Sequence, residues 1–261
     1  MPAGDEDIAM TASPSASVAL HRTAARYWTE SRQPLAGLLF VTPLLVIYEA
    51  GVLALGPAGV RNGVDALLRK SLEGLGFSQY FLLPVLTVGV LLAWHYLTRR
   101  PWRVSGGVFY GMIGECGLLS ICLCLLLHLQ GRLLSMMTGT VTLDIGGALG
   151  SLTAYLGAGV YEELLFRLLL LSLLAWVMGR FRLSPTAAMV GAVLLSSLLF
   201  AAAHYVGPYG DRFTLSFFCF RTLAGIFFAV LFVYRGFGIA AGTHAGYDLL
   251  VGLAQLGIGG G

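Results

Sequence analysis

The amino-acid sequence predicts an all-α, polytopic transmembrane helix bundle of seven or eight spans, and three observations support this fold class. Of the 261 residues, 57% are hydrophobic and only 11% are charged, whereas a soluble domain carries about 25% charged residues. The mean hydropathy is +0.82, and the apolar residues form runs of about 20, the length that crosses a bilayer. The net charge of +3 is small and thinly spread, which excludes a nucleic-acid-binding surface and leaves the lipid bilayer as the first partner.

The predicted elements follow a polar N-terminal segment, residues 1–34, in which we expect no cleaved signal peptide. Apolar runs long enough for a spanning helix lie at 35–56, 80–98, 108–130, 146–178, 185–204, 214–234 and 238–257. The run 146–178 is too long for one upright crossing. We expect it to be tilted, or to break near Gly157 and Gly159 and so give an eighth span. The chain then divides into N-terminal spans, 35–145, and a C-terminal group, 146–257.

Basic residues indicate how the bundle is oriented. With a cytoplasmic N-terminus, nine arginines fall in cytoplasmic segments and five basic residues fall outside. The first set is Arg22, Arg26, Arg32, Arg99, Arg100, Arg103, Arg180, Arg182 and Arg235; the second is Arg61, Arg69, Lys70, Arg132 and Arg212. Because basic residues concentrate in cytoplasmic loops, the sequence predicts an integral membrane protein with its N-terminus in the cytoplasm.

Ionisable residues inside apolar runs point to function, because each costs at least about 2.5–3.5 kcal/mol at the bilayer centre. The segment Tyr161-Glu162-Glu163-Leu164-Leu165-Phe166-Arg167 holds three of them. Glu163 and Arg167 are four residues apart on one helical face, so they are predicted to pair. Glu162 projects about 100° away and has no partner on its own helix, which makes it a candidate general base. The alternative is that both glutamates only join helices.

Two later spans carry further polar residues. Phe200-Ala201-Ala202-Ala203-His204 ends the fifth run, and His244-Ala245-Gly246-Tyr247-Asp248 places a histidine and an aspartate on one face of the last. The small residues between them allow close helix packing, so we expect one internal polar cavity. A glutamate–histidine pair that activates water fits this set. Zinc-dependent hydrolysis is the alternative, although the H-E-x-x-H motif of zincins is absent. A serine nucleophile is discounted, because no serine lies in a G-x-S-x-G turn.

The ordered motifs E-E-x-x-x-R at 162–167, F-x-x-x-H at 200–204 and H-x-x-x-D at 244–248 resemble the CPBP family. This family comprises CAAX prenyl proteases of the Ras-converting-enzyme type and bacteriocin-processing or immunity enzymes. The resemblance covers about residues 146–257, which would form the family's four-helix catalytic core. It implies an intramembrane endopeptidase. The family has been classed as metalloproteases, but its best-understood members resemble glutamate-dependent enzymes that work without metal.

The resemblance also implies roles for individual residues. Glu162 would be the catalytic glutamate, His204 would polarise the attacking water, and His244 would contact the oxyanion. The supporting residues would be Glu163, Arg167 and Phe200. The last motif position is more often asparagine in the family, whereas this chain has Asp248, which cannot donate a hydrogen bond when it is ionised. We therefore expect Asp248 to orient His244 or to be protonated.

No cofactor is expected, because no ligand pair has the short helical spacing typical of zincins. Zinc is the alternative cofactor, with Glu162, His204 and His244 as its ligands. Asp248, one turn from His244, would make a fortuitous metal site more plausible, and zinc there could inhibit by occupying the position of the attacking water.

The expected substrate is a membrane-associated protein or peptide. The arginine-rich, lysine-poor composition resembles a bacterial protein, which predicts a location in the bacterial inner (cell) membrane and favours membrane-proximal peptides over prenylated ones. The rival hypothesis is a non-enzymatic membrane protein, either an immunity or scaffold protein or a proton-coupled transporter, that uses the same polar cavity.

Two further expectations concern the packing of the helices. Glu49, isolated in the first span, is predicted to be structural and held by an arginine such as Arg221. With upright helices, His204 and His244 would differ in depth by more than about 10 Å, so a tilted, shifted or re-entrant helix is needed to bring them together. Glycines at 236, 238 and 242 would let the last helix start deeper.

Overall fold

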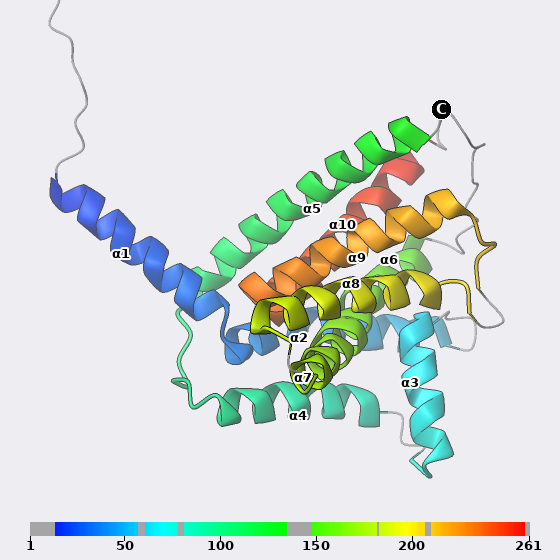
Figure 1. Ribbon diagram of the computed structural model, residues 1–261, viewed down its shortest axis with the longest axis horizontal. Helices are drawn as coiled ribbons and strands as arrows, with labels where there is room; N and C mark the ends of the chain where they lie inside the picture. The colour runs from blue at the N-terminus through cyan, green and yellow to red at the C-terminus, as the bar shows by residue number, and fades with distance from the viewer. Residues whose placement is uncertain are drawn as a thin grey trace, which may run out of the picture.

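The computed structural model describes residues 14–56, 61–77, 81–134, 148–181, 183–206 and 210–258, and every regular element within them is helical. The predicted all-α fold is therefore confirmed for this part of the chain. Figure 1 shows the helices packed as one bundle, from which the N-terminal helix α1 (Pro14–Ser31) projects at one end. The expected boundary between residues 145 and 146 lies outside the described residues, as does Arg182.

Local sequence signals set the ends of the next helices. α2 (Pro34–Leu55) begins with a proline, whose missing N–H would be unpaired in a first turn anyway. It ends at Gly56, where φ is +57°, a left-handed conformation that glycine adopts without strain. The other helices of this half are α3 (Gly63–Gly74), α4 (Leu82–Leu97) and α5 (Gly106–Leu134).

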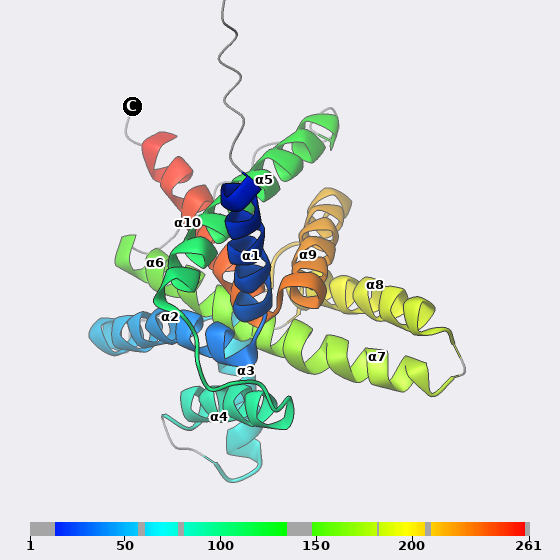
Figure 2. The same cartoon turned by 90° about the vertical axis from the view of Figure 1, so that its left-hand side faces the viewer.

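One long helix runs without interruption from Ala148 to Gly179. Its parts are α6 (Ala148–Gly157), the π-helical segments η2 (Ala158–Glu162) and η3 (Leu164–Leu171), and α7 (Ser172–Gly179). Figure 2 shows α6 and α7 as opposite ends of this helix, which crosses the bundle obliquely and does not fold back. The helix is continuous and oblique to its neighbours, and at the place where a break was expected the chain changes from α to π geometry.

The last three helices are α8 (Pro185–Ala203), α9 (Leu215–Arg235) and α10 (Phe237–Ile258). Ser184 and Thr214 cap the starts of α8 and α9, because their hydroxyls accept hydrogen bonds from backbone N–H groups of the first turn. A single residue, Gly236 with φ of +84°, joins α9 to α10. The two helices therefore form a tight hairpin whose geometry glycine permits.

Four helices of the described residues are long and apolar enough to cross a membrane. They are α2, residues Gly106–Gln130 of α5, α8 and α9, while α4 is a shorter apolar helix. These helices support an integral membrane protein. The total of seven or eight spans and the cytoplasmic N-terminus stay predictions.

α10 lies at the centre of the bundle and packs against α2, α5, α9 and η2. Glycine allows the close contact between η2 and α10. A Cβ atom on Gly159 of η2 would lie 2.6 Å from the Cβ of Ala245 in α10, and 2.8 Å from the carbonyl oxygen of Ala241. Any larger residue would push the two helices apart. The glycine therefore brings the glutamates that follow it in the sequence against α10.

The helix α3 was not among the predicted elements. The segment between the apolar runs 35–56 and 80–98 was interpreted as a connection. It has 12 residues and packs Val64, Leu68 and Leu72 against the hydrophobic core around α2 and η2. Asp65 on the same helix is fully buried. Figure 1 shows α3 crosswise to α2 and α4.

A buried ion pair fixes α1 to the bundle. Arg235, at the end of α9, pairs with Glu115 of α5 through two hydrogen bonds of 2.6 and 2.7 Å. The same guanidinium donates to the Ser31 hydroxyl at 2.9 Å and lies 3.7 Å from the centre of the Trp28 ring. The sequence placed Arg235 in a cytoplasmic segment, whereas only 4% of it is exposed.

Candidate active site

A buried hydrogen bond joins Glu163 to His244 of α10. Glu163 Oε1 lies 2.8 Å from His244 Nδ1, and the glutamate has no exposed surface. An ionised carboxylate only accepts hydrogen bonds, so Nδ1 carries the proton of this contact. The other ring nitrogen, Nε2, is then available to interact with the groups on the opposite side of the site.

The predicted pair between Glu163 and Arg167 is confirmed, at 3.2 Å between Oε2 and Nε. Arg167 is only 1% exposed and also donates to the carbonyl oxygen of Gly225 at 3.2 Å. Its Cζ atom lies 4.3 Å from the ring centre of Phe200 and 5.6 Å from that of Phe228. The buried guanidinium is thus compensated by one carboxylate, one carbonyl and two aromatic faces.

His244 Nε2 faces two further carboxylates. It lies 4.0 Å from Glu162 Oε2 and 3.6 Å from Asp248 Oδ2. The ring stacks on Phe228, with 4.3 Å between ring centres and 14° between planes. Glu163, Phe228 and Asp248 together fix the imidazole, so the place of Asp248 agrees with an orienting role.

Glu162 is 8% exposed and has a partner that the sequence did not suggest. Its Oε1 atom accepts a hydrogen bond from Asn62 Nδ2 at 2.9 Å. Asn62 is the N-cap of α3, 100 residues earlier in the chain. One carboxylate oxygen is therefore held by α3, and the other points toward His244.

His204 lies at the end of α8, half-buried, with Nδ1 2.9 Å from the carbonyl oxygen of Phe200. A carbonyl accepts, so Nδ1 carries the proton here too, and Nε2 is the unprotonated nitrogen of the neutral ring. The Phe200 ring lies 5.0 Å from the His204 ring and 6.1 Å from the His244 ring, centre to centre. The oblique helices thus bring both histidines to one aromatic side chain, despite the difference in depth expected for upright spans.

The proposed zinc ligands do not converge as a metal site. Within the described residues, no group of three or more His, Cys, Asp or Glu side chains is placed to hold an ion. The Nδ1 atom of His244 is already bonded to Glu163. Metal independence stays a prediction, which needs a chemical test.

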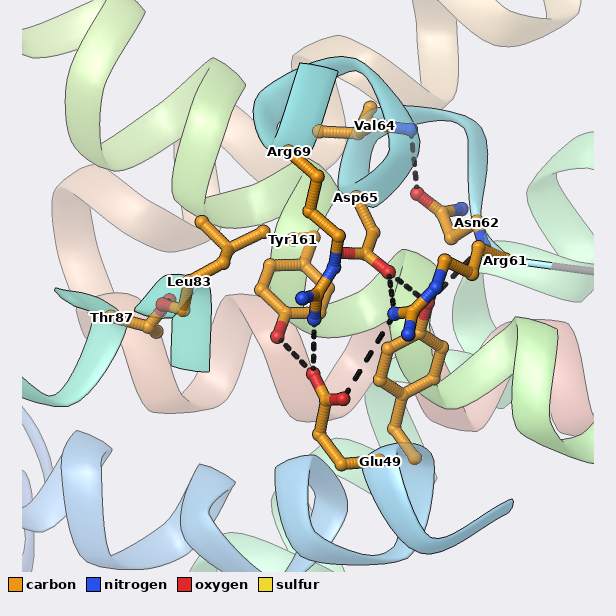
Figure 3. A network of polar contacts seen from close by, with 10 residues as sticks. Glu49, Arg61, Asn62, Val64, Asp65, Arg69, Leu83, Thr87 and Tyr161 are labelled. Carbon is orange, nitrogen blue, oxygen red and sulfur yellow. Dashed lines mark hydrogen bonds and ion pairs between the residues drawn. The ribbon is translucent and has the colours of Figure 1, made fainter. Parts of the chain in front are cut away.

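A second polar network borders this site and includes Glu49 (Figure 3). Glu49 Oε1 accepts hydrogen bonds from Arg69 at 2.9 Å and from the Tyr161 hydroxyl at 2.7 Å. Asp65 accepts from Arg69 at 2.6 Å and from Arg61 at 2.8 Å. The network ties α2 and α3 to η2 at the residue just before Glu162.

The predicted partner of Glu49 was wrong, although its pairing with arginine was right. Arg221 forms an ion pair with Asp211 before α9, and its guanidinium lies 5.2 Å from the Tyr205 ring centre. Glu49 is bound by Arg69 of α3 at 2.9 Å, and Arg61, just before that helix, lies 4.0 Å away. Both arginines are closer to Glu49 along the chain than Arg221 is.

Sequence reasoning missed Asn62 and the helix that it begins. A signal was present, because Arg61, Asp65 and Arg69 recur every four residues, the spacing of one helical face. Asn62 is a preferred N-cap residue, and Asp65 follows at the third helical position, where acidic residues favour a helix start.

Comparison with known proteins identifies one family. Residues 144–250 match the family described as type II CAAX prenyl endopeptidase Rce1-like. No curated protein and no solved structure matches the chain. The matched segment contains Glu162, His204, His244 and Asp248, whereas Asn62 precedes it.

Proposed function

We propose that the protein is an intramembrane endopeptidase. The premise is the match of residues 144–250 to the Rce1-like family of type II CAAX prenyl endopeptidases. The protein hydrolyses a peptide bond of a membrane-associated protein or peptide. The observation that carries the proposal is the placement of Glu162 Oε2 4.0 Å from His244 Nε2, while Glu163 holds the other ring nitrogen. A base and a donor thus face each other at a buried position in the bundle.

The first step is attack by water on the scissile carbonyl carbon. Glu162 takes a proton from the water through one of its carboxylate oxygens. His204 accepts a hydrogen bond from the same water through Nε2 and so orients it. The oxygen–carbon bond forms, and the carbonyl π electrons move to the oxygen.

The resulting oxyanion needs a positioned donor. His244, protonated on Nε2 and held by Glu163 on Nδ1, donates to that oxygen, and Asp248 keeps the ring in place. Such donors act strongly where water is excluded, and loss of one typically lowers kcat about 10²- to 10³-fold.

Collapse of the tetrahedral intermediate completes the reaction. The carbon–nitrogen bond breaks, and Glu162 returns its proton to the leaving nitrogen. The oxyanion electrons re-form the carbonyl, so the products are a new carboxylic acid on one fragment and a new amine on the other, and the carboxylate of Glu162 is regenerated. The proton of the new acid then passes to the amine through water, which leaves a carboxylate and an ammonium group.

The experiment uses purified protein in liposomes with an internally quenched peptide that ends in a C-a-a-X sequence. The peptide is supplied with a farnesylated cysteine and, separately, without the prenyl group. We expect wild-type cleavage of at least one form, and Glu162→Gln to lower kcat between about 10²- and 10⁴-fold while the protein stays folded.

Glu73→Gln is the matched control, because Glu73 is an exposed carboxylate on α3 outside the site. It should cleave like the wild type. Full activity of purified Glu162→Gln would refute the assignment of the base, and absence of cleavage of either peptide would favour the non-enzymatic alternative.

We further propose that cleavage needs no metal. Activity should survive exhaustive chelation in a sample whose metal content is measured in parallel. Loss of cleavage that returns with one equivalent of zinc would contradict this, and would make the carboxylate and imidazole groups ligands instead.

A further inference from the structure

We propose that Asn62 is a positioning residue for Glu162, supplied to the site by α3 from outside the family segment. The inference rests on the proposed function, since it assigns a partner to the proposed catalytic base. It adds a residue that none of the three motifs contains. It also means that the C-terminal helices alone do not complete the site.

The orientation of the Asn62 amide is fixed from both sides. Its Nδ2 donates to Glu162 Oε1 at 2.9 Å, and its Oδ1 accepts from Val64 N–H at 2.9 Å. A flipped amide would place oxygen against carboxylate and NH₂ against N–H, so both contacts would be lost. The helix cap therefore aims the NH₂ group at the glutamate.

The start of α3 is itself held in place. Asp65, in the first turn, has no exposed surface and accepts hydrogen bonds from Arg61, Arg69 and the Tyr48 hydroxyl at 2.8, 2.6 and 2.7 Å (Figure 3). The Tyr48 hydroxyl also accepts from the backbone N–H of Asn62 at 3.3 Å. The backbone that carries the amide is therefore anchored to α2.

The hydrogen bond has two consequences for Glu162. It selects between the carboxylate oxygens, since Oε1 is bound to Asn62 and Oε2 is left facing His244. It also stabilises negative charge on Oε1, an interaction that Asn62→Ser would remove. The free oxygen, Oε2, is therefore the one that takes the proton from water in the proposed reaction.

The alternative is that Asn62 only caps α3, and Asn62→Ser separates the two roles. Serine is as good an N-cap as asparagine, but its hydroxyl is too short to serve Val64 N–H and reach Glu162 together. Asn62→Asp also keeps the cap and replaces the donor with a second carboxylate. Ser184→Ala is the matched control. It removes the N-cap of α8, which lies at the opposite end of that helix from His204.

The first measurement is steady-state cleavage of the quenched C-a-a-X peptides. For Asn62→Ser we expect kcat to fall about 10- to 100-fold with KM little changed, the effect of losing a hydrogen bond to a charged group. The acid limb of its pH–activity profile should move to higher pH. Ser184→Ala should keep the wild-type kcat and profile, even if its melting temperature falls.

The second measurement needs no substrate. Dicyclohexylcarbodiimide modifies protonated carboxyl groups in apolar surroundings, and mass spectrometry reports the modified fraction of Glu162 at each pH. Modification should extend to higher pH in Asn62→Ser, and further still in Asn62→Asp, than in the wild type. This shift tests the inference even if neither peptide is cleaved, an outcome that would count against the proposed function alone.

The inference is overturned if Asn62→Ser, with a wild-type melting temperature, retains the wild-type modification profile of Glu162. It is equally overturned if both cap-retaining variants cleave the peptide with the wild-type kcat and pH profile. Should Asn62→Ser fail to fold, the near-isosteric Asn62→Asp carries the same comparison.

Discussion

Glu163 differs in role from Glu162 because it has two buried partners. The carboxylate compensates the buried Arg167 and fixes the tautomer of His244. We predict that Glu163→Gln lowers both stability and activity, since an uncompensated buried charge costs roughly 3–5 kcal/mol. Glu162→Gln should lower activity alone.

The measurement is thermal unfolding in detergent together with kcat per folded molecule. A melting temperature of Glu163→Gln equal to that of Glu162→Gln would contradict this division of roles.

The Glu163–Arg167 pair could be predicted from the sequence because both residues lie on one helical face. The bond from Glu163 to His244 could not, because it depends on the crossing of two distant helices.

Glycine at position 159 sets the distance between the helix that carries the glutamates and α10. We predict that Gly159→Ala lowers kcat while leaving most of the bundle folded, because the added methyl group would lie 2.6 Å from the Ala245 Cβ and force the helices apart. Gly63→Ala is the control, because a Cβ atom there meets open space. Cleavage by Gly159→Ala at the wild-type rate would show that this contact is not needed.

The π-helical geometry around Glu162 and Glu163 was not predictable from hydrophobic periodicity. The apolar run over 146–178 indicates a helix, but π turns depend on what packs against it. Here the close approach at Gly159 and the two buried glutamates provide that packing. Such turns occur frequently at functional sites, which agrees with their place in this chain.

The last turn of α1 binds the start of α5 through Glu30. Its carboxylate accepts hydrogen bonds from Arg26 at 2.5 Å and from the backbone N–H and hydroxyl of Ser105 at 3.0 and 2.7 Å. The hydrogen bond from Arg26, with those from Ser105, lowers the pKa of Glu30 from 4.5 to about 2. A depressed pKa stabilises the folded state above pH 4.5, and this contribution is lost as the pH falls toward 2.

We therefore predict that Glu30→Gln melts at a lower temperature than the wild type at pH 7. The difference should shrink steadily as the pH is lowered from 5 to 3. Melting curves at pH 7, 5 and 3 check this. A difference that grows on acidification would have the wrong sign and would exclude the contact as its cause. The effect should be small, because Glu30 is only partly buried.

At the scale of the whole molecule, three polar clusters have separate roles. The network around Glu49 and Asp65 joins α2, α3 and η2. The cluster around Glu162 carries the proposed chemistry, whereas Glu115 and Arg235 join α1, α5 and α9. We predict that Glu115→Gln destabilises the protein by roughly 3–5 kcal/mol, because Arg235 loses its only carboxylate partner among the described residues. The kcat per folded molecule should stay within about twofold of the wild-type value. Unfolding and cleavage measured on one preparation test this separation.

The fold class and the motif residues were accessible from sequence, but the contribution of the N-terminal half was not. Composition and the length of apolar runs suffice to indicate a membrane bundle. The order of three motifs predicts Glu162, His204 and His244 as site residues, and the structure places Glu162 and His244 close together. α3 escaped detection because its 12 residues are too few to cross a membrane and its buried face carries charge. Arg221 was the wrong partner for Glu49 because a sequence does not tell which of several arginines is near.

The one-residue junction at Gly236 fixes where α10 begins, and therefore where His244 lies along it. His244 is the eighth residue after that junction, so its Cα lies about 12 Å along the helix from Gly236. One residue inserted before His244 would rotate the imidazole by about 100° and take it out of reach of the substrate.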